Sequence, residues 1–173
     1  GSLNVAKKVI LNTTDATASI PTEKFDFTVK FDFPEGTDKD TLGGVKDKDG
    51  KGVTITNGET KFQLAHDENM KFTGLPVGTT ITVTEAAKAN YKASAKVTLN
   101  GVEQTAVAAS KYNAALTEVD QQKLGQNKNT VDVTNRFNNV PTTGIIMNTL
   151  PYVLMIALCG AALFGFVAFK RRR

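Results

Sequence analysis

The chain has 173 residues, of which 40% are hydrophobic and 22% charged, a composition typical of one globular domain with an appendage. Its net charge of +4 is accounted for by the four basic residues 170–173, so the rest of the chain is electrically balanced. A neutral domain has no surplus positive charge with which to displace phosphate counterions, so we expect no nucleic-acid partner. The single cysteine, Cys159, excludes an intrachain disulfide, and the single histidine, His66, excludes a multi-histidine metal site. We therefore expect no metal and no cofactor, and the composition argues against an enzyme.

Strict alternation of apolar and polar residues predicts β-strands through most of the chain. In residues 25–33, every odd position is Phe or Val and every even position is polar, which is typical of a half-buried strand. Similar patterns predict further strands in residues 3–11, 53–55, 62–64, 70–72, 81–83, 91–99 and 131–133. Many short strands separated by turn residues indicate an all-β fold of the β-sandwich class.

Turn signals separate these strands. Asn57-Gly58 and Asn100-Gly101 are typical of tight hairpins, and residues 47–50 are interpreted as a further turn. Residues 75–79, Leu-Pro-Val-Gly-Thr, are also interpreted as a turn between strands. Residues 104–128 have weak patterning, and we assign no strand there.

The C-terminal region predicts a membrane span. Residues 150–169 carry no charge and are long enough to cross a hydrocarbon core of about 30 Å as a helix. The basic residues 170–173 follow at once, and such clusters stay on the cytoplasmic side, so the preceding domain is expected to be extracellular. Because an outward-facing domain needs export, we expect that an export signal, and possible further domains, precede this sequence in the parent protein.

A short motif lies just before the predicted span. The run Val140-Pro141-Thr142-Thr143-Gly144, with the span and the basic tail, resembles the cell-wall sorting signal of Gram-positive surface proteins. The core of that signal is Leu-Pro-any-Thr-Gly, and the leading Val resembles a variant found in pilins. The resemblance implies that a sortase cleaves between Thr143 and Gly144 and passes the Thr143 acyl group to an amine. Residues 75–79 have a similar composition, but no apolar span follows them.

Three polar residues occupy positions where the alternation calls for apolar side chains. Lys7, Glu85 and Asn135 each share the phase of the buried residues on their strand. Burying a lysine and a carboxyl is costly unless the two groups pair or neutralise each other. If the three share one site, desolvation lowers the lysine pKa and raises the glutamate pKa, and the neutral amine can attack the asparagine carbonyl with release of ammonia. The alternative is that bulges or strand ends place each group in solvent.

Three runs precede the sorting signal: Leu3-any-Val5-any-Lys7, Leu75-Pro76-Val77-Gly78 leading to Val83-Thr84-Glu85, and Val133-Thr134-Asn135. Together with that signal, they resemble the T-antigen-type backbone pilin domain of streptococci. That domain belongs to the CnaB-like immunoglobulin folds, which form an intramolecular Lys–Asn isopeptide bond with the help of an acidic residue. The resemblance implies that Lys7 is the nucleophile, Asn135 the electrophile and Glu85 the catalytic acid. Lys8 and Asn138 are the nearest competitors for the first two roles, and both fall on the outward phase.

The sequence therefore predicts an immunoglobulin-like (CnaB-type) β-sandwich in residues 1–137. A linker with the sortase motif follows in residues 138–144, then a transmembrane helix in 145–169 and a cytoplasmic tail in 170–173. We expect a surface-exposed structural subunit of a sortase-assembled pilus or stalk, which is a substrate of sortase and not a turnover enzyme. Its expected partners are the sortase, neighbouring pilin subunits or peptidoglycan joined through Thr143, and the membrane before sorting.

The alternative is the membrane-proximal stalk of a wall-anchored adhesin. A secreted hydrolase is a weaker alternative, because His66 has no visible nucleophile partner. The lysine that would accept the next subunit is left open between one on a preceding N-terminal domain and an exposed lysine of this domain, such as Lys111 or Lys123.

Overall fold

The computed structural model of the protein describes residues 1–13, 17–37 and 45–138. The predicted sortase motif, the predicted transmembrane helix and the basic tail lie outside these residues. Within the described part, no helix is long and apolar enough to cross a membrane.

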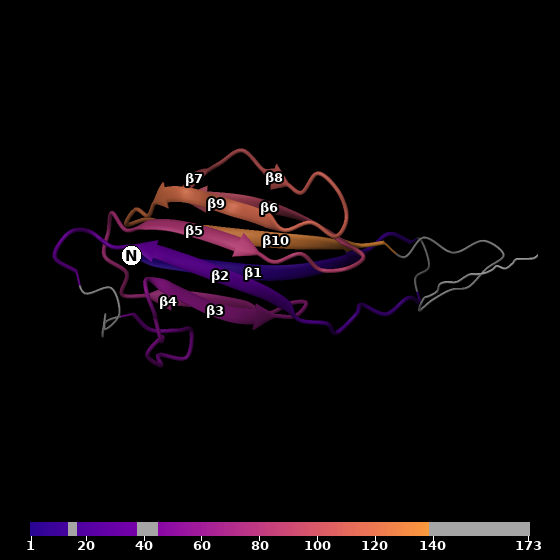
Figure 1. Ribbon diagram of the computed structural model, residues 1–173, viewed down its shortest axis with the longest axis horizontal. Helices are drawn as coiled ribbons and strands as arrows, with labels where there is room; N and C mark the ends of the chain where they lie inside the picture. Colours follow the sequence, from indigo (N-terminus) through magenta and orange to yellow (C-terminus); the bar gives the residue numbers. More distant parts are fainter. Residues whose placement is uncertain (14–16, 38–44, 139–173) are drawn as a thin grey trace, which may run out of the picture. The chain divides into compact units, whose positions relative to one another are not determined.

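The described residues form two β-sheets packed face to face (Figure 1). The strands are β1 Ser2–Leu11, β2 Phe25–Asp32, β3 Glu59–Leu64, β4 Asn69–Thr73, β5 Thr80–Glu85, β6 Tyr91–Leu99, β7 Val102–Glu103, β8 Val107–Ala108, β9 Leu116–Lys123 and β10 Thr130–Phe137. The large sheet has the order β4-β1-β10-β6-β7, with β8 also paired to β6, and the small sheet has the order β3-β2-β5-β9. The predicted all-β sandwich is thus confirmed for the described residues.

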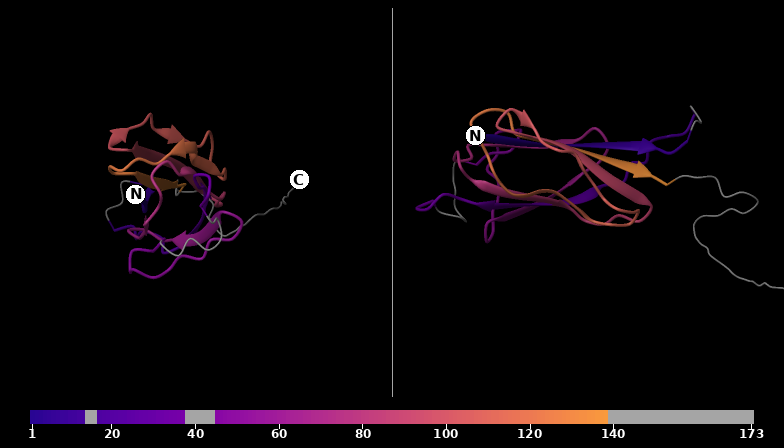
Figure 2. Two further views of the ribbon diagram at one scale, coloured as in Figure 1. Left: turned by 90° about the vertical axis from the view of Figure 1, so that its left-hand side faces the viewer. Right: turned by 90° about the horizontal axis from the view of Figure 1, so that it is seen from above.

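The first and last strands lie side by side in the centre of the large sheet. β1 and β10 run parallel, with Asn4 opposite Thr130 and Leu11 opposite Phe137 (Figure 2, right). All other strand pairs in the described residues are antiparallel. Because β1 and β10 are parallel, the chain enters β1 at one end of the sheet and leaves β10 at the other.

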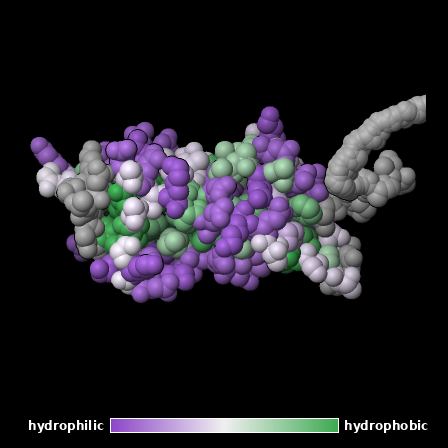
Figure 3. Space-filling model, turned by 60° about the horizontal axis from the view of Figure 1, so that its bottom comes forward, coloured by the Kyte–Doolittle hydropathy of each residue, from purple (hydrophilic) through white to green (hydrophobic). Residues whose placement is uncertain are grey.

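The apolar phase of each strand forms the core between the sheets. On β2, Phe25, Phe27, Val29 and Phe31 are buried, while the intervening Asp26 and its even-numbered neighbours face outward. Strands from the large sheet contribute Leu3, Val5, Val97, Val131 and Val133, among others, to the same cluster. One outer face is mostly hydrophilic, with smaller apolar areas between the polar side chains (Figure 3). The alternation thus defines which side of each sheet is removed from water.

The two Asn-Gly pairs form the tight turns that the sequence predicts. Asn57 and Gly58 have φ values of 52° and 79°, and Asn100 and Gly101 have φ values of 52° and 80°. Positive φ at both central positions is what a type I′ hairpin turn requires. Residues 75–79 also form a turn, in which the Thr79 side chain donates a 2.7 Å hydrogen bond to the Pro76 carbonyl.

Two expectations about secondary structure need correction. Residues 53–55 are not a strand, because the flanking Gly52 and Thr56 make only isolated bridges, to Lys46 and Glu59. The unassigned segment 104–128 contains β8 and the eight-residue strand β9. β9 escaped prediction because its second half, residues 120–123, is polar and exposed on both faces of the strand.

Candidate functional site

Lys7 places a charged side chain at the centre of the core. The residue is 1% exposed and lies on β1 with its side chain directed between the sheets. Its Nζ donates hydrogen bonds to the Lys8 carbonyl at 2.8 Å and to Oδ1 of Asn135 at 2.6 Å. The same atom lies 3.8 Å from Oε2 of Glu85 and 4.1 Å from the centre of the Phe25 ring. The ring face provides a favourable surface for a cation or an amine.

Asn135 and Glu85 reach Lys7 from two different strands. In the parallel pair, Lys7 is opposite Val133 and Asn135 is opposite Val9, so Lys7 and Asn135 are diagonal neighbours on the inner face. Glu85 comes from the small sheet, at the end of β5 opposite Phe27 of β2. Asn135 is 2% exposed and Glu85 is 1% exposed. The predicted burial of all three residues is confirmed, and the structure brings them together.

Burial shifts the pKa values of Lys7 and Glu85 toward each other. Desolvation lowers the pKa of Lys7 to about 8, although the nearby charges of Glu85 and then Glu118 oppose the shift. Desolvation raises the pKa of Glu85, opposed by the Lys7 charge and by hydrogen bonding from Asn135 and Lys7. Each shift favours the uncharged form. A neutral amine beside a neutral carboxyl is therefore accessible near neutral pH.

This arrangement has the components for forming an amide. An unprotonated Nζ has a lone pair that can attack the carbonyl carbon of Asn135, whose oxygen it already contacts. A protonated Glu85 can donate a hydrogen bond to the oxygen as negative charge develops, and can carry a proton to the leaving nitrogen. No cofactor is needed for such a step.

The two competing residues lie outside this cluster. Lys8 is 62% exposed at its side chain, and its ammonium pairs with Asp67 on the surface. Asn138 is exposed, and its backbone N–H donates to the Asn90 carbonyl. Lys111 and Lys123 are both exposed, and nothing in their surroundings distinguishes either as an acceptor.

A fourth polar residue at the site was not predicted from the sequence. Glu118 lies on β9 and is 3% exposed, and neither of its carboxyl oxygens has a hydrogen-bond partner within the described part of the chain. Burial raises its pKa to about 9, and the negative charge of Glu85 adds to the shift. Its position could not be found from a period of two, because it lies at a β-bulge where that period is broken.

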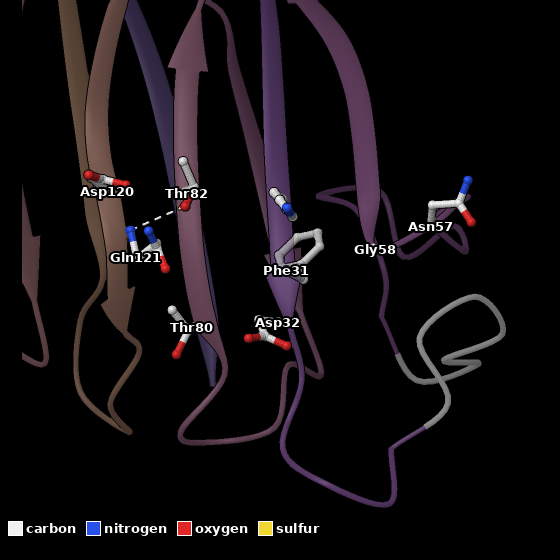
Figure 4. Close-up of a pocket in the computed structure, with 9 residues that line it drawn as sticks. Phe31, Asp32, Asn57, Gly58, Thr80, Thr82, Asp120 and Gln121 are labelled. Atoms are coloured by element: carbon white, nitrogen blue, oxygen red, sulfur yellow. Dashed lines mark hydrogen bonds between the residues drawn. The ribbon is translucent and has the colours of Figure 1, made fainter.

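A groove on the small sheet is separate from this cluster. It has a volume of about 460 Å³ and is lined by residues of β2, β5 and β9 and of the turn at Asn57, which are mostly polar apart from Phe31 (Figure 4). Thr82 accepts a 3.1 Å hydrogen bond from the backbone N–H of Gln121 across it. The groove is not lined by Lys7, Glu85 or Asn135, so we assign the groove no part in their chemistry.

Residues 1–137 match the family model of a domain of unknown function, DUF7601. The chain belongs to this family. No curated protein matches the sequence significantly. The family boundary at residue 137 coincides with the end of β10, so the family model covers the sandwich and ends before the predicted sortase motif.

Solved structures show where the same fold occurs. The major pilin of one Streptococcus pyogenes serotype matches with a TM-score of 0.56 and 25% identity, over 79% of this chain and 44% of that one. The major pilin of a second serotype matches with a TM-score of 0.54 and 22% identity, over 79% and 44%. A pilus-presented adhesin matches with a TM-score of 0.52 and 21% identity, over 78% and 27%. The domain therefore has a pilin-type fold, and the chain spans less than half the length of these structures.

Proposed function

We propose that this protein is a structural subunit of a sortase-assembled pilus, with a domain locked by an isopeptide bond between Lys7 and Asn135. The observation that carries the proposal is the buried contact of Lys7 Nζ with Asn135 Oδ1 at 2.6 Å, beside Glu85. The similarity to major pilins supports the assignment to a pilus. A displayed pilus subunit is extracellular, in agreement with the expected orientation of the sequence.

The bond forms in a balanced, single-turnover reaction. The uncharged Nζ of Lys7 forms a bond to the side-chain carbonyl carbon of Asn135, and the bond from that carbon to the amide nitrogen breaks. Glu85 protonates the developing oxyanion and takes that proton back when the carbonyl re-forms, and it relays one proton from Nζ to the leaving nitrogen. The products are one amide and one ammonia, and Glu85 regains its original protonation state.

The position of the bond suits a subunit under tension. Tension applied at the two ends of the domain acts along the parallel strands β1 and β10, which pair from Asn4 and Thr130 to Leu11 and Phe137. A covalent bond from Lys7 to Asn135 transmits that force directly, so the intervening residues 8–134 are not extended. A pilus subunit with such a bond resists unfolding by mechanical force.

Assembly is assigned to the C-terminal motif. We propose that sortase cleaves between Thr143 and Gly144 and joins Thr143 to an amine of the next subunit or of peptidoglycan. The predicted apolar helix 145–169 and basic tail 170–173 hold the precursor in the membrane until that step. After cleavage, the domain is attached to the pilus or the cell wall.

The test is polymerisation of the full chain by a pilin-class sortase in a Gram-positive host. A ladder of covalent oligomers supports the pilus subunit, and Thr143→Ala should abolish it. Val77→Ala provides a matched control, because Val77 is 49% exposed in the similar pentapeptide 75–79 and should not affect the ladder. A single product joined only to the cell wall would contradict polymerisation.

That last result would support a second candidate, the membrane-proximal stalk of a wall-anchored adhesin. The match to a pilus-presented adhesin favours this candidate, because the chain covers only 27% of that structure and thus corresponds to one part of it. A stalk would keep the Lys7–Asn135 bond and the anchoring step, but would not form oligomers.

A further inference from the structure

Three fully buried side-chain oxygens lack a hydrogen-bond partner within the described residues, and all three belong to Glu85 and Glu118. The two glutamates lie on neighbouring strands of the small sheet, β5 and β9, and both are directed into the core. A carboxylate can only accept hydrogen bonds, so two ionised carboxylates cannot satisfy each other. A proton on one of them supplies the missing donor.

A β-bulge directs Glu118 toward this position. Glu85 is opposite Leu116, Thr84 is opposite Thr117, and Val83 is opposite Val119, so Glu118 is an extra residue on β9. As a result Glu118 and Val119, which are consecutive, are both buried. Bulges re-aim single side chains and are frequent beside active sites. The local backbone thus departs from regular pairing at Glu118 itself.

The surrounding charges indicate which glutamate holds the proton. The charged groups that act on Glu118 are Glu85 from β5 and Lys7 from β1. Asn135 of β10 is uncharged, and Tyr91 of β6 donates its hydroxyl to Glu23 at 2.7 Å. Glu85 is within 3.8 Å of the Lys7 amine, whereas neither oxygen of Glu118 has a polar partner among the described residues. Ionisation is therefore least favourable at Glu118.

We propose that Glu118 is a positioning residue for the cross-linking reaction, in which its carboxyl O–H donates a hydrogen bond to Oε2 of Glu85 and holds that carboxyl toward Lys7 and Asn135. This inference rests on the proposed function, because it assigns a role in the Lys7–Asn135 reaction. Glu118 forms no covalent bond and keeps its proton throughout. The proton exchanged with Lys7 is carried by Glu85 alone.

The test measures how fast the bond forms in the protein and in two variants. Each chain is recovered unfolded in urea before the bond has formed, refolded by dilution, and sampled over time by intact mass for the loss of one ammonia. Glu118→Leu removes the donor while filling a similar volume, and should slow bond formation by roughly tenfold or more. Glu118→Gln retains an N–H donor for Glu85, and should restore most of the rate.

A stability measurement separates positioning from a merely structural role. Asn135→Ala prevents the bond, so melting can be compared in this background with and without the further substitution Glu118→Leu or Glu118→Gln. Because Leu removes the hydrogen bond to Glu85 but also the desolvation cost of a buried carboxyl, Glu118→Leu should change the melting temperature little, although it reacts more slowly. The proposal is overturned if Glu118→Leu and the parent form the bond at equal rates. It is also overturned if both substitutions slow bond formation equally and lower the melting temperature.

The protonation state gives a second, independent result. In the Asn135→Ala protein, the side-chain carboxyl carbon of Glu118 is followed by NMR across neutral pH, and its chemical shift should be that of a protonated acid. An ionised Glu118 at pH 7 overturns the positioning role even if the bond forms. A parent chain that never loses ammonia contradicts the proposed function instead, and the carboxyl titration still decides whether Glu118 holds its proton.

Discussion

Lys7 and Asn135 are 128 positions apart in the sequence, yet the Nζ of one donates a 2.6 Å hydrogen bond to the side-chain oxygen of the other inside the core. The contact depends on the parallel pairing of the first and last strands, which places Asn135 diagonally across from Lys7. A covalent bond at this point would close almost the entire domain into one loop. Such a loop would change the stability, the mass and the mechanical response of the domain.

Removing either partner should leave the fold intact and lower its stability. In the chain-entropy model of cross-links, closing a loop of this length removes entropy worth about 5 kcal/mol from the unfolded state. For a domain of this size, Lys7→Ala or Asn135→Ala should lower Tm by roughly 15 °C in calorimetry. Lys8→Ala is the control, because Lys8 makes an exposed ion pair with Asp67 and should change Tm little. Equal melting of Lys7→Ala and the parent would show that no cross-link stabilises the domain.

Glu85→Gln should fold but fail to form the bond at an appreciable rate. Gln keeps the size and polarity of the side chain, but it cannot exchange a proton with the Lys7 amine at 3.8 Å. After expression, the intact mass of this variant should equal the mass calculated from its sequence, with no loss of ammonia. Glu103→Gln is the matched control, because Glu103 pairs with Lys96 on the surface, and it should lose one ammonia as the parent does.

Stability should fall as pH rises through the neutral range. The pKa of Glu118 is raised from 4.5 to about 9 by burial, so between these values the folded protein binds a proton that the unfolded chain has released. The loss approaches about 1.4 kcal/mol per pH unit, and Glu85, whose pKa is also raised, adds to it in the same direction. Urea unfolding of Asn135→Ala at pH 5 to 7 should show this slope.

The matched variant isolates the contribution of Glu118. Asn135→Ala with Glu118→Gln should be more stable than Asn135→Ala at pH 7, with a shallower dependence on pH. Lys7 does not produce the slope in this window, because its pKa of about 8 in the folded protein leaves it protonated in both states below pH 7. An identical slope in the two proteins would show that Glu118 is ionised in the folded state.

Mechanical extension should distinguish the linked from the unlinked domain. When single molecules are pulled from both ends, the parent domain should not lengthen by an unfolding step, because residues 8–134 are bypassed by the bond. Lys7→Ala should unfold in one step and release that length. An unfolding step of full length in the parent would contradict the proposed path of force.

Much of the site was predictable because alternation is a local property. Lys7, Glu85 and Asn135 each lie on a strand that keeps a period of two, so their phase alone placed them in the core. The pairing of β1 with β10 is not local, and it entered only through the resemblance to a known fold. Glu118 was not predictable, since the bulge on β9 shifts the phase at that residue.

The strand predicted at residues 53–55 is wrong because alternation is local and does not report strand pairing. Val53 and Ile55 alternate with Thr54 as strand residues do, and Ile55 is buried, but the segment makes no ladder with a neighbour among the described residues. Alternation therefore indicates which side chains face the core, while strand pairing depends on the partner that the fold provides.

The most direct test of the cross-link is the intact mass of residues 1–143, produced beside Lys7→Ala and Glu85→Ala. We predict that the parent alone lacks one ammonia, and that tandem mass spectrometry finds a fragment in which Lys7 is joined to Asn135. An unmodified mass in a folded parent would contradict the central claim, and would leave the pilin-type fold without its proposed bond.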